Sequence, residues 1–241
     1  MYKLTQFGFS DMMHSRSAIR ALFDAEPETL SEAAERVVNF FYRELVDDSG
    51  QPACALVRLF KTHPYAELDR DLQAYVRQTV PHAAQVEGLR CLVLLATTGD
   101  LPEWRSRQAS RGHRAIPLVS EQMVQEAPMI AQLIEQFGLR VSTVLNPDPR
   151  LLLENATTFN IFYVPRAVGS PYIVAQEEFV LRHGIQSVLG FGGILASGDL
   201  FAAIMFSKIP ITPEVADRFK VVGLNMKLAI LPLIAKPLFA R

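Results

Sequence analysis

The most distinctive polar stretch of the sequence is residues 104–114, which read Trp-Arg-Ser-Arg-Gln-Ala-Ser-Arg-Gly-His-Arg and are called here the arginine segment. It holds four arginines, one histidine and one tryptophan, and no acidic residue. Guanidinium groups bind carboxylates or phosphates in bidentate fashion, and an indole offers a face for stacking. The arginine segment therefore predicts a site for an anionic or planar small molecule. The alternative is a solvated loop whose arginines pair with distant acids.

A second candidate is Arg58, which stands inside the apolar run 53–61. A guanidinium in a buried strand needs a partner, because an unpaired charge is costly away from water. Strand alternation places Arg58 on the same face as Cys54, Leu56 and Phe60. Arg58 therefore either faces a ligand or runs its stem along the sheet toward solvent.

Further candidates flank a break in the chain at residues 169–171, Gly-Ser-Pro. Irregular loops on a rigid scaffold often carry binding groups, although tyrosines are also ordinary core or rim residues. The complete set of predicted ligand-binding residues is Arg58, Trp104, Arg111, His113, Tyr163, Tyr172 and Gln176.

The histidines and cysteines predict neither a metal site nor catalysis. No two of the five histidines have the i, i+4 spacing of a helical metal site. His113 or His183 alone would suffice as an axial haem ligand, but the sequence carries no second mark of haem, and we assign no cofactor. Cys54 and Cys91 each lie inside an apolar run, which is typical of reduced core thiols.

Composition bounds the class of protein. The chain has 241 residues, of which 49% are hydrophobic and 20% charged, with a formal net charge of -1. This content supports a full core and excludes disorder, and the charge balance excludes a generic nucleic-acid binder. We read no secretory signal, and the apolar stretch 185–206 is interrupted by polar residues and glycines. A cytoplasmic location without a membrane span is expected.

Local patterns indicate the elements of the first two thirds. Helices are expected within 10–47, the second behind Thr29, which forms a capping-box pattern with Glu32. Buried strands follow at 53–61 and 91–96 with a helix between them, an order that fits either a parallel crossover or an antiparallel sheet. The later elements are an edge strand at 115–118, a helix at 120–137 kinked at its proline, and a strand at 158–164.

The last third predicts a hairpin followed by a helix. Strands at 185–195 and 200–207 surround a Ser-Gly-Asp turn, and the glycines of 190–193 indicate bulges where a strand bends. Thr212 caps a helix that has Pro213 at its first position. Core packing explains the apolar stripe of this helix, and pairing in a homodimer is the alternative; the stripe is Val215, Phe219, Val222 and Met226.

Residues 184–230 resemble the closing part of GAF sensory domains, through Gly-Phe-Gly-Gly, the Ser-Gly-Asp turn, Leu-Phe-Ala-Ala-Ile-Met-Phe and Ile-Pro-Ile-Thr-Pro-Glu. Nearly the whole chain is also similar to the N-terminal sensor regions of bacterial signalling histidine kinases, at 111–118, 127–130, 169–172 and 189–193. The resemblance implies an α+β, GAF-like fold, with a central, mostly antiparallel sheet of about five or six strands, helices packed on it and an N-terminal helical extension.

The same resemblance sets the expected organisation. Residues 1–241 form a single domain, with N-terminal helices in 10–47, the sheet in 53–208 with an irregular insert around 100–160, and a C-terminal helix at 212–231. The kinase family's phospho-acceptor helix and ATP-binding glycine boxes are not found in this sequence.

The function that the resemblance implies is that of a non-catalytic sensory or regulatory domain in bacterial signal transduction. It would bind a small molecule in a pocket over the sheet and signal through its terminal helix to a histidine kinase or cyclase output module. Two alternatives stay open: a GAF-type redox enzyme that reduces free methionine sulfoxide with its cysteines, and an interaction module that dimerises without a ligand.

Overall fold

The computed structural model describes residues 1–147 and 159–240. In this part of the chain six strands form one sheet in the order β5-β4-β3-β8-β7-β6, and each neighbouring pair is antiparallel. The expected α+β class is confirmed. The first two strands of this sheet along the chain, which have a helix between them in sequence, pair in antiparallel fashion. The strands are β3 (Cys54–Pro64), β4 (Arg90–Gly99), β5 (Ala115–Leu118), β6 (Phe159–Val164), β7 (Ser187–Ile194) and β8 (Leu200–Ser207).

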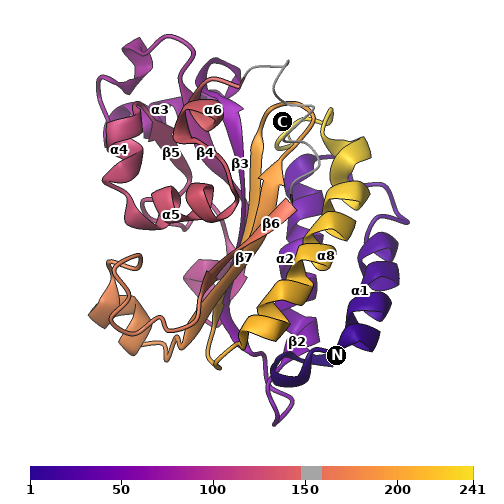
Figure 1. Ribbon diagram of the computed structural model, residues 1–241. Coiled ribbons are helices and arrows are strands. Elements are labelled where there is room, and N and C mark those ends of the chain that lie inside the picture. Colours follow the sequence, from indigo (N-terminus) through magenta and orange to yellow (C-terminus); the bar gives the residue numbers. More distant parts are fainter. Residues whose placement is uncertain (148–158, 241) are drawn as a thin grey trace.

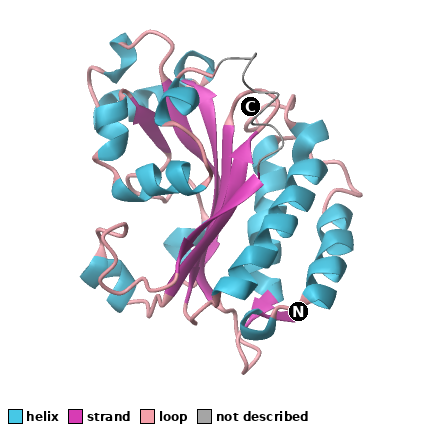
Figure 2. Ribbon diagram, viewed as in Figure 1, coloured by secondary structure: helices cyan, strands magenta, loops and turns pink. Residues whose placement is uncertain are grey.

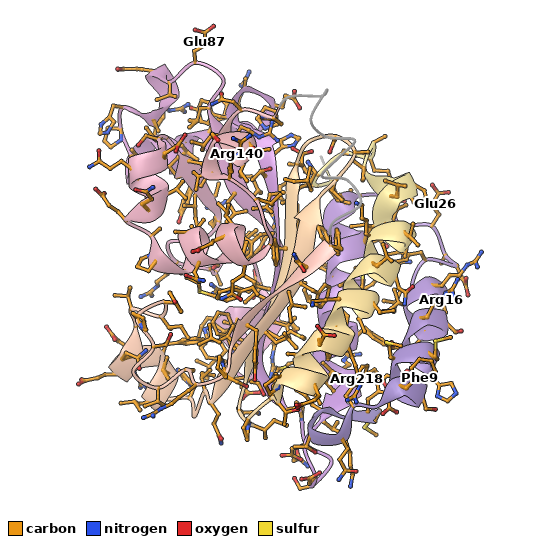
Figure 3. All side chains as sticks on the ribbon, viewed as in Figure 1. Phe9, Arg16, Glu26, Glu87, Arg140 and Arg218 are labelled. Carbon is orange, nitrogen blue, oxygen red and sulfur yellow. The ribbon has the colours of Figure 1, made fainter. Side chains whose placement is uncertain are left out.

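Long helices cover one face of the sheet. Helices α2 (Leu30–Glu44) and α8 (Pro213–Ile230) pack directly on the strands, and α1 (Phe9–Ala21) lies outside them against α8 (Figure 1). Phe9 and Arg16 mark the outer side of α1 (Figure 3). A short parallel pair, β1 (Tyr2–Lys3) with β2 (Leu45–Val46), ties the start of the chain to the end of α2.

The caps predicted for these helices are present. The Thr29 side chain accepts a hydrogen bond from the Glu32 backbone N–H at 3.1 Å, and Thr212 accepts one from Val215 at 3.4 Å. All four residues of the apolar stripe of α8 are buried against the rest of the domain. Core packing therefore accounts for this stripe, and it is not free to pair with a second copy.

Shorter elements cover the other face (Figure 2). The predicted helix 120–137 is split into α4 (Glu121–Gln125) and α5 (Pro128–Gln136), because a residue before proline is disfavoured in helical conformation. Gly138 ends α5 with a positive φ of 74°. Helix α6 (Val141–Leu145) and a π-helical turn at Gln176–Leu181 were not expected from the sequence. Helix α3 (Arg70–Thr79) contacts the edge strand β5.

Two expectations about strand geometry are wrong. β7 pairs with β6 and β8 without a register shift, so its glycines are not bulges. A Cβ on Gly192 would lie 2.0 Å from the Phe201 carbonyl oxygen, so this glycine instead permits close approach of β8. A register shift does occur between Cys54 and Leu56. It places Cys54 in the core under the long helices, opposite to Leu56, and not on the face of Arg58 as expected.

The expected insert around 100–160 contains β5 and the short helices α4 to α6. Residues 148–158, including part of the strand expected at 158–164, lie outside the described residues. Within the described ranges, no helix combines the length and the apolar character needed to cross a membrane.

Candidate ligand cavity

A cavity of about 1130 Å³ opens on the face of the sheet opposite to α2 and α8. Leu56, Arg58 and Phe206 form its floor, the arginine segment one wall, residues 127–130 at the start of α5 another, and residues 172–175 with Phe179 a third. Five of the seven residues predicted from the sequence line it, namely Arg58, Trp104, Arg111, His113 and Tyr172.

Arg58 is the unusual group in the floor of this cavity. It lies on a central strand of the sheet, β3, where its register partners are Ile204 of β8 and Thr97 of β4. Among the described residues its one hydrogen bond goes from Nη2 to Ser110 Oγ at 3.5 Å, and its buried Nε has no partner. None of the carboxylates in the described residues forms an ion pair with Arg58. Burial lowers the pKa of Arg58 to about 10, so the side chain remains charged at neutral pH.

Two further arginines add positive charge to the walls. Arg111 is exposed, whereas Arg114 is half-buried with its guanidinium carbon 5.2 Å from the centre of the Tyr75 ring. The Nε of Arg114 is also buried without a hydrogen-bond partner. Glu103 is the acid among the described lining residues, so the cavity carries an excess of positive charge.

His113 contributes a hydrogen-bonding group rather than another charge. Its Nδ1 lies 2.7 Å from the Arg111 carbonyl oxygen, which assigns the proton to Nδ1 and leaves Nε2 as an acceptor. Desolvation, followed by the charge on Arg58, lowers the pKa of His113. The imidazole is therefore neutral at pH 7.

An aromatic cluster supplies the apolar wall. Ring centroids are 5.7 Å apart for Trp104 and Phe179 and 4.9 Å apart for Phe179 and Phe206, both in edge-on arrangements. His183 packs edge-on against Trp104 at 4.6 Å, outside the lining of the cavity. The wall suits a flat, apolar ligand body. Phe179 and Phe206 were missed from the sequence, because an apolar residue in a strand or a short turn carries no sign of the side it faces.

Tyr163 and Gln176 do not line the cavity. The Tyr163 hydroxyl donates to the Ile211 carbonyl, and its backbone N–H donates to Gln136 Oε1 at 2.7 Å. Gln176 accepts from Gly169 N–H at 2.8 Å and donates to three backbone carbonyls of residues 167–173. Gln176 thus braces the loop that carries Tyr172 to the cavity.

The arginine segment divides between two sides of the molecule. Arg105 donates to the carbonyl oxygens of Gly99 and Asp100 at 3.0 and 3.1 Å, and Arg107 lies over the Phe239 ring at 3.6 Å. Both line a smaller groove of about 450 Å³ beside α2, whereas Arg111 and Arg114 line the large cavity. No residue pattern in the arginine segment indicates this division.

The cysteines lie away from the cavity. Cys54 and Cys91 are free and buried in the core under the long helices, and burial raises the pKa of both thiols to about 12. They therefore lack the thiolate character that redox catalysis requires. Where the structure describes the chain, no group of three or more histidines, cysteines and acids could hold a metal ion.

No protein-family model and no curated protein matches this sequence. Similar solved structures include the chromophore-binding domain of the bacteriophytochrome RpBphP3 from R. palustris (TM-score 0.43, 12% identity), which covers 93% of this chain and 63% of that one. The chain thus spans less than two thirds of the R. palustris structure.

The comparisons also include two GAF domains from cyanobacterial phytochromes. One is bound to phycocyanobilin (TM-score 0.43, 10% identity, 92% of this chain and 94% of that one), and the other to phycoerythrobilin (TM-score 0.40, 11% identity, 92% and 93%). Within the described residues, the present chain has an α+β fold built on an antiparallel six-strand sheet.

Proposed function

We propose that this chain is a sensory domain that binds a small molecule with an anionic group and a flat apolar body. The single observation behind this is Arg58, a charged side chain on a central strand of the sheet that faces a cavity without an acidic partner among the described residues. A carboxylate or phosphate on Arg58 would satisfy its free N–H groups in bidentate geometry. The aromatic cluster around Trp104 and Phe179 would hold the body of the ligand.

The energetic logic favours a ligand over a purely structural role. An unpaired buried charge destabilises a fold by several kcal/mol in rough terms, whereas a matched counter-charge offsets that penalty. At about 1130 Å³ the cavity lies slightly above the usual size of small-molecule sites, roughly 300–1,000 Å³, and so has room for a ligand with an extended flat body. The predicted residues Arg58, Trp104, Arg111, His113 and Tyr172 constitute the proposed site.

The role in signalling extends this proposal. A ligand shifts a conformational equilibrium only if it binds one state more tightly, so the bound domain must differ in packing from the free one. We place the domain in the cytoplasm, in keeping with two thiols kept in its core, and assign it a histidine kinase or cyclase as output module. The alternative of a methionine sulfoxide reductase lacks support, since neither cysteine reaches the cavity.

Thermal-shift and calorimetric titration test the proposal. The probes are biliverdin, cyclic GMP, AMP and citrate, which combine anionic groups with large, medium or no planar bodies; biliverdin is included because two of the similar structures hold bilins. We expect a probe with both features to raise Tm, and Arg58→Met to weaken its binding by about 100-fold, the loss expected for a desolvated charge pair. Arg105→Met, outside the cavity, is the matched control.

Two results would overturn this function. One is that none of the four probes changes Tm at millimolar concentration. The other is that a probe binds with equal affinity to the wild type and to Arg58→Met, which would place the ligand elsewhere.

A further inference from the structure

Residues 231–240, called here the tail, fold back from the end of α8 onto the start of α2. The carbonyl oxygens of Pro237 and Leu238 accept hydrogen bonds from the backbone N–H groups of Leu30 and Ser31, both at 2.9 Å. These two N–H groups belong to the first turn of α2, where no intrahelical acceptor exists. Because water is an alternative acceptor for them, the tail can leave this position without stranding a buried donor.

The tail also contacts the arginine segment directly. The guanidinium carbon of Arg107 lies 3.6 Å from the centre of the Phe239 ring, a close cation–π contact. Lys236 forms a separate ion pair with Glu26 at 2.7 Å. Glu26 lies on the outer side of the helical layer (Figure 3). Of the described tail residues, Phe239 is thus the one in cation–π contact with the arginine segment.

The same segment forms a wall of the cavity. Trp104, Arg111 and Arg114 line the cavity, three residues before and four and seven residues after Arg107. Only a short 3-10 turn at Pro102–Arg105 is regular in residues 102–114, and Gly112 has a positive φ of 74°. Few backbone hydrogen bonds hold this segment in place, so a displacement at Trp104 or Arg111 can be transmitted to Arg107.

We propose that the arginine segment couples occupancy of the cavity to the docking of the tail on α2, so that a ligand at Arg58 and Arg111 changes the fraction of molecules with Phe239 docked. This inference rests on the proposed function in one respect, namely that the signal is a ligand bound in the cavity. The coupling itself is a property of the free chain. It assigns the output to the tail rather than to the body of α8, whose apolar stripe is fixed in the core.

The chain carries its own reporter for this coupling. Trp104 is the single tryptophan of the sequence and lies in the cavity wall. Acrylamide quenching of its fluorescence measures how open that wall is, and it needs no ligand. Phe239→Ala removes the ring under Arg107, Phe239→Leu keeps an apolar side chain there without a π face, and Lys236→Ala breaks only the ion pair with Glu26.

We expect both Phe239 variants to change the quenching constant of Trp104, and Lys236→Ala to leave it at the wild-type value. In the same variants, hydrogen exchange at the Leu30 and Ser31 amides should rise roughly twofold to thirtyfold, the range given by loss of a cation–π contact. The Met205 amide in β8 should not change, which separates local release of the tail from global unfolding.

The reverse direction uses cavity variants. Trp104→Ala should increase exchange at Leu30 and Ser31 relative to Met205, whereas Tyr172→Ala, which changes a lining residue outside the arginine segment, should not. Unchanged Trp104 quenching in both Phe239 variants, or equal effects of Trp104→Ala and Tyr172→Ala on the two amides, would overturn the coupling. Because none of these measurements contains a ligand, failure of the four probes to bind would sink the proposed function and leave the coupling standing.

Discussion

Two arginines at opposite ends of the β3–β4 pair solve the same problem differently. Arg90 and Arg58 each have a buried Nε without a hydrogen-bond partner among the described residues. Arg90, however, pairs with Asp199, which also lies 2.5 Å from Lys61 in an almost fully buried cluster. Arg58 faces the cavity, and its one hydrogen-bond partner among the described residues is the Ser110 hydroxyl. Arg90 has an acidic partner within the fold, whereas Arg58 has none among the described residues, and the proposed function assigns that place to a ligand.

The difference shows how to distinguish a structural from a functional buried charge. A cation with an internal partner stabilises the fold only as long as the partner is present, since either one alone is costly to bury. A cation without such a partner weakens the free fold and gains from binding. Substitutions at the two ends should therefore have opposite effects on stability.

The largest effect is expected from Asp199→Asn. The change leaves Lys61 and Arg90 buried without a neutralising carboxylate, and the free energy of unfolding should fall by about 3–5 kcal/mol. Urea denaturation measures it. Asp100→Asn is the control, because its pair with Lys208 at 3.0 Å is partly exposed and should contribute no more than about 1 kcal/mol. Equal losses in the two variants would show that the buried cluster has no special weight.

A smaller and more diagnostic effect is expected from one substitution made at both arginines. Arg90→Met should lower the free energy of unfolding by about 1–3 kcal/mol, because Asp199 loses one of its two partners. Arg58→Met should leave it unchanged or raise it by up to about 2 kcal/mol, because an unpaired charge is replaced by an apolar side chain. Calorimetric Tm values give the comparison. A loss at Arg58 as large as at Arg90 would mean that Arg58 is held by the fold itself.

The smallest effect concerns pH, through the histidine at each end. Burial, and then the charge on Lys61, lowers the pKa of His63 to about 4 from its usual 6.5. As the pH falls, His63 is therefore protonated near pH 6.5 in the unfolded chain but only near pH 4 in the folded chain. Stability should be constant above pH 6.5 with respect to this group and fall between pH 6.5 and 4, by about 1–2 kcal/mol after solvent screening.

Urea denaturation of His63→Gln and His113→Gln from pH 7 to 4 checks this expectation. His63→Gln should flatten the curve relative to the wild type. His113 also has a lowered pKa but is exposed, so His113→Gln should flatten it less. A larger change for His113 would reverse the assignment of the pH-sensitive end.

Local signals in the sequence predicted the elements well where a single residue decides the backbone. Thr29 and Thr212 begin helices, Pro117 marks an edge strand, and the turn at 197–199 closes a hairpin. Local sequence patterns gave a wrong prediction where the backbone geometry depends on contact with a residue distant in sequence. Gly192 indicated a bulge, but its absent side chain makes room for the backbone at Phe201.

The candidate site could be predicted from the sequence where a charged residue stands in an apolar segment or where charges of one sign gather. Arg58 stands out in an apolar strand, and the composition of the arginine segment indicates an anion. The side that each loop residue faces could not be predicted, because it depends on how residues 99–114 pass around the end of β4. Arg105 and Arg107 therefore turned out to hold backbone and tail, and Gln176 to brace a loop.

The position of β3 between β4 and β8 also affects how the chain is made. The hydrogen bond from Ser207 to Ala53 joins residues 154 positions apart. During synthesis, β3 therefore cannot pair with β8 until the residues between them have been made. During that interval one edge of an apolar strand is unpaired, a condition that slows folding and invites aggregation. Premature release of a truncated chain that ends before residue 200 would therefore yield insoluble material rather than a partly functional fragment.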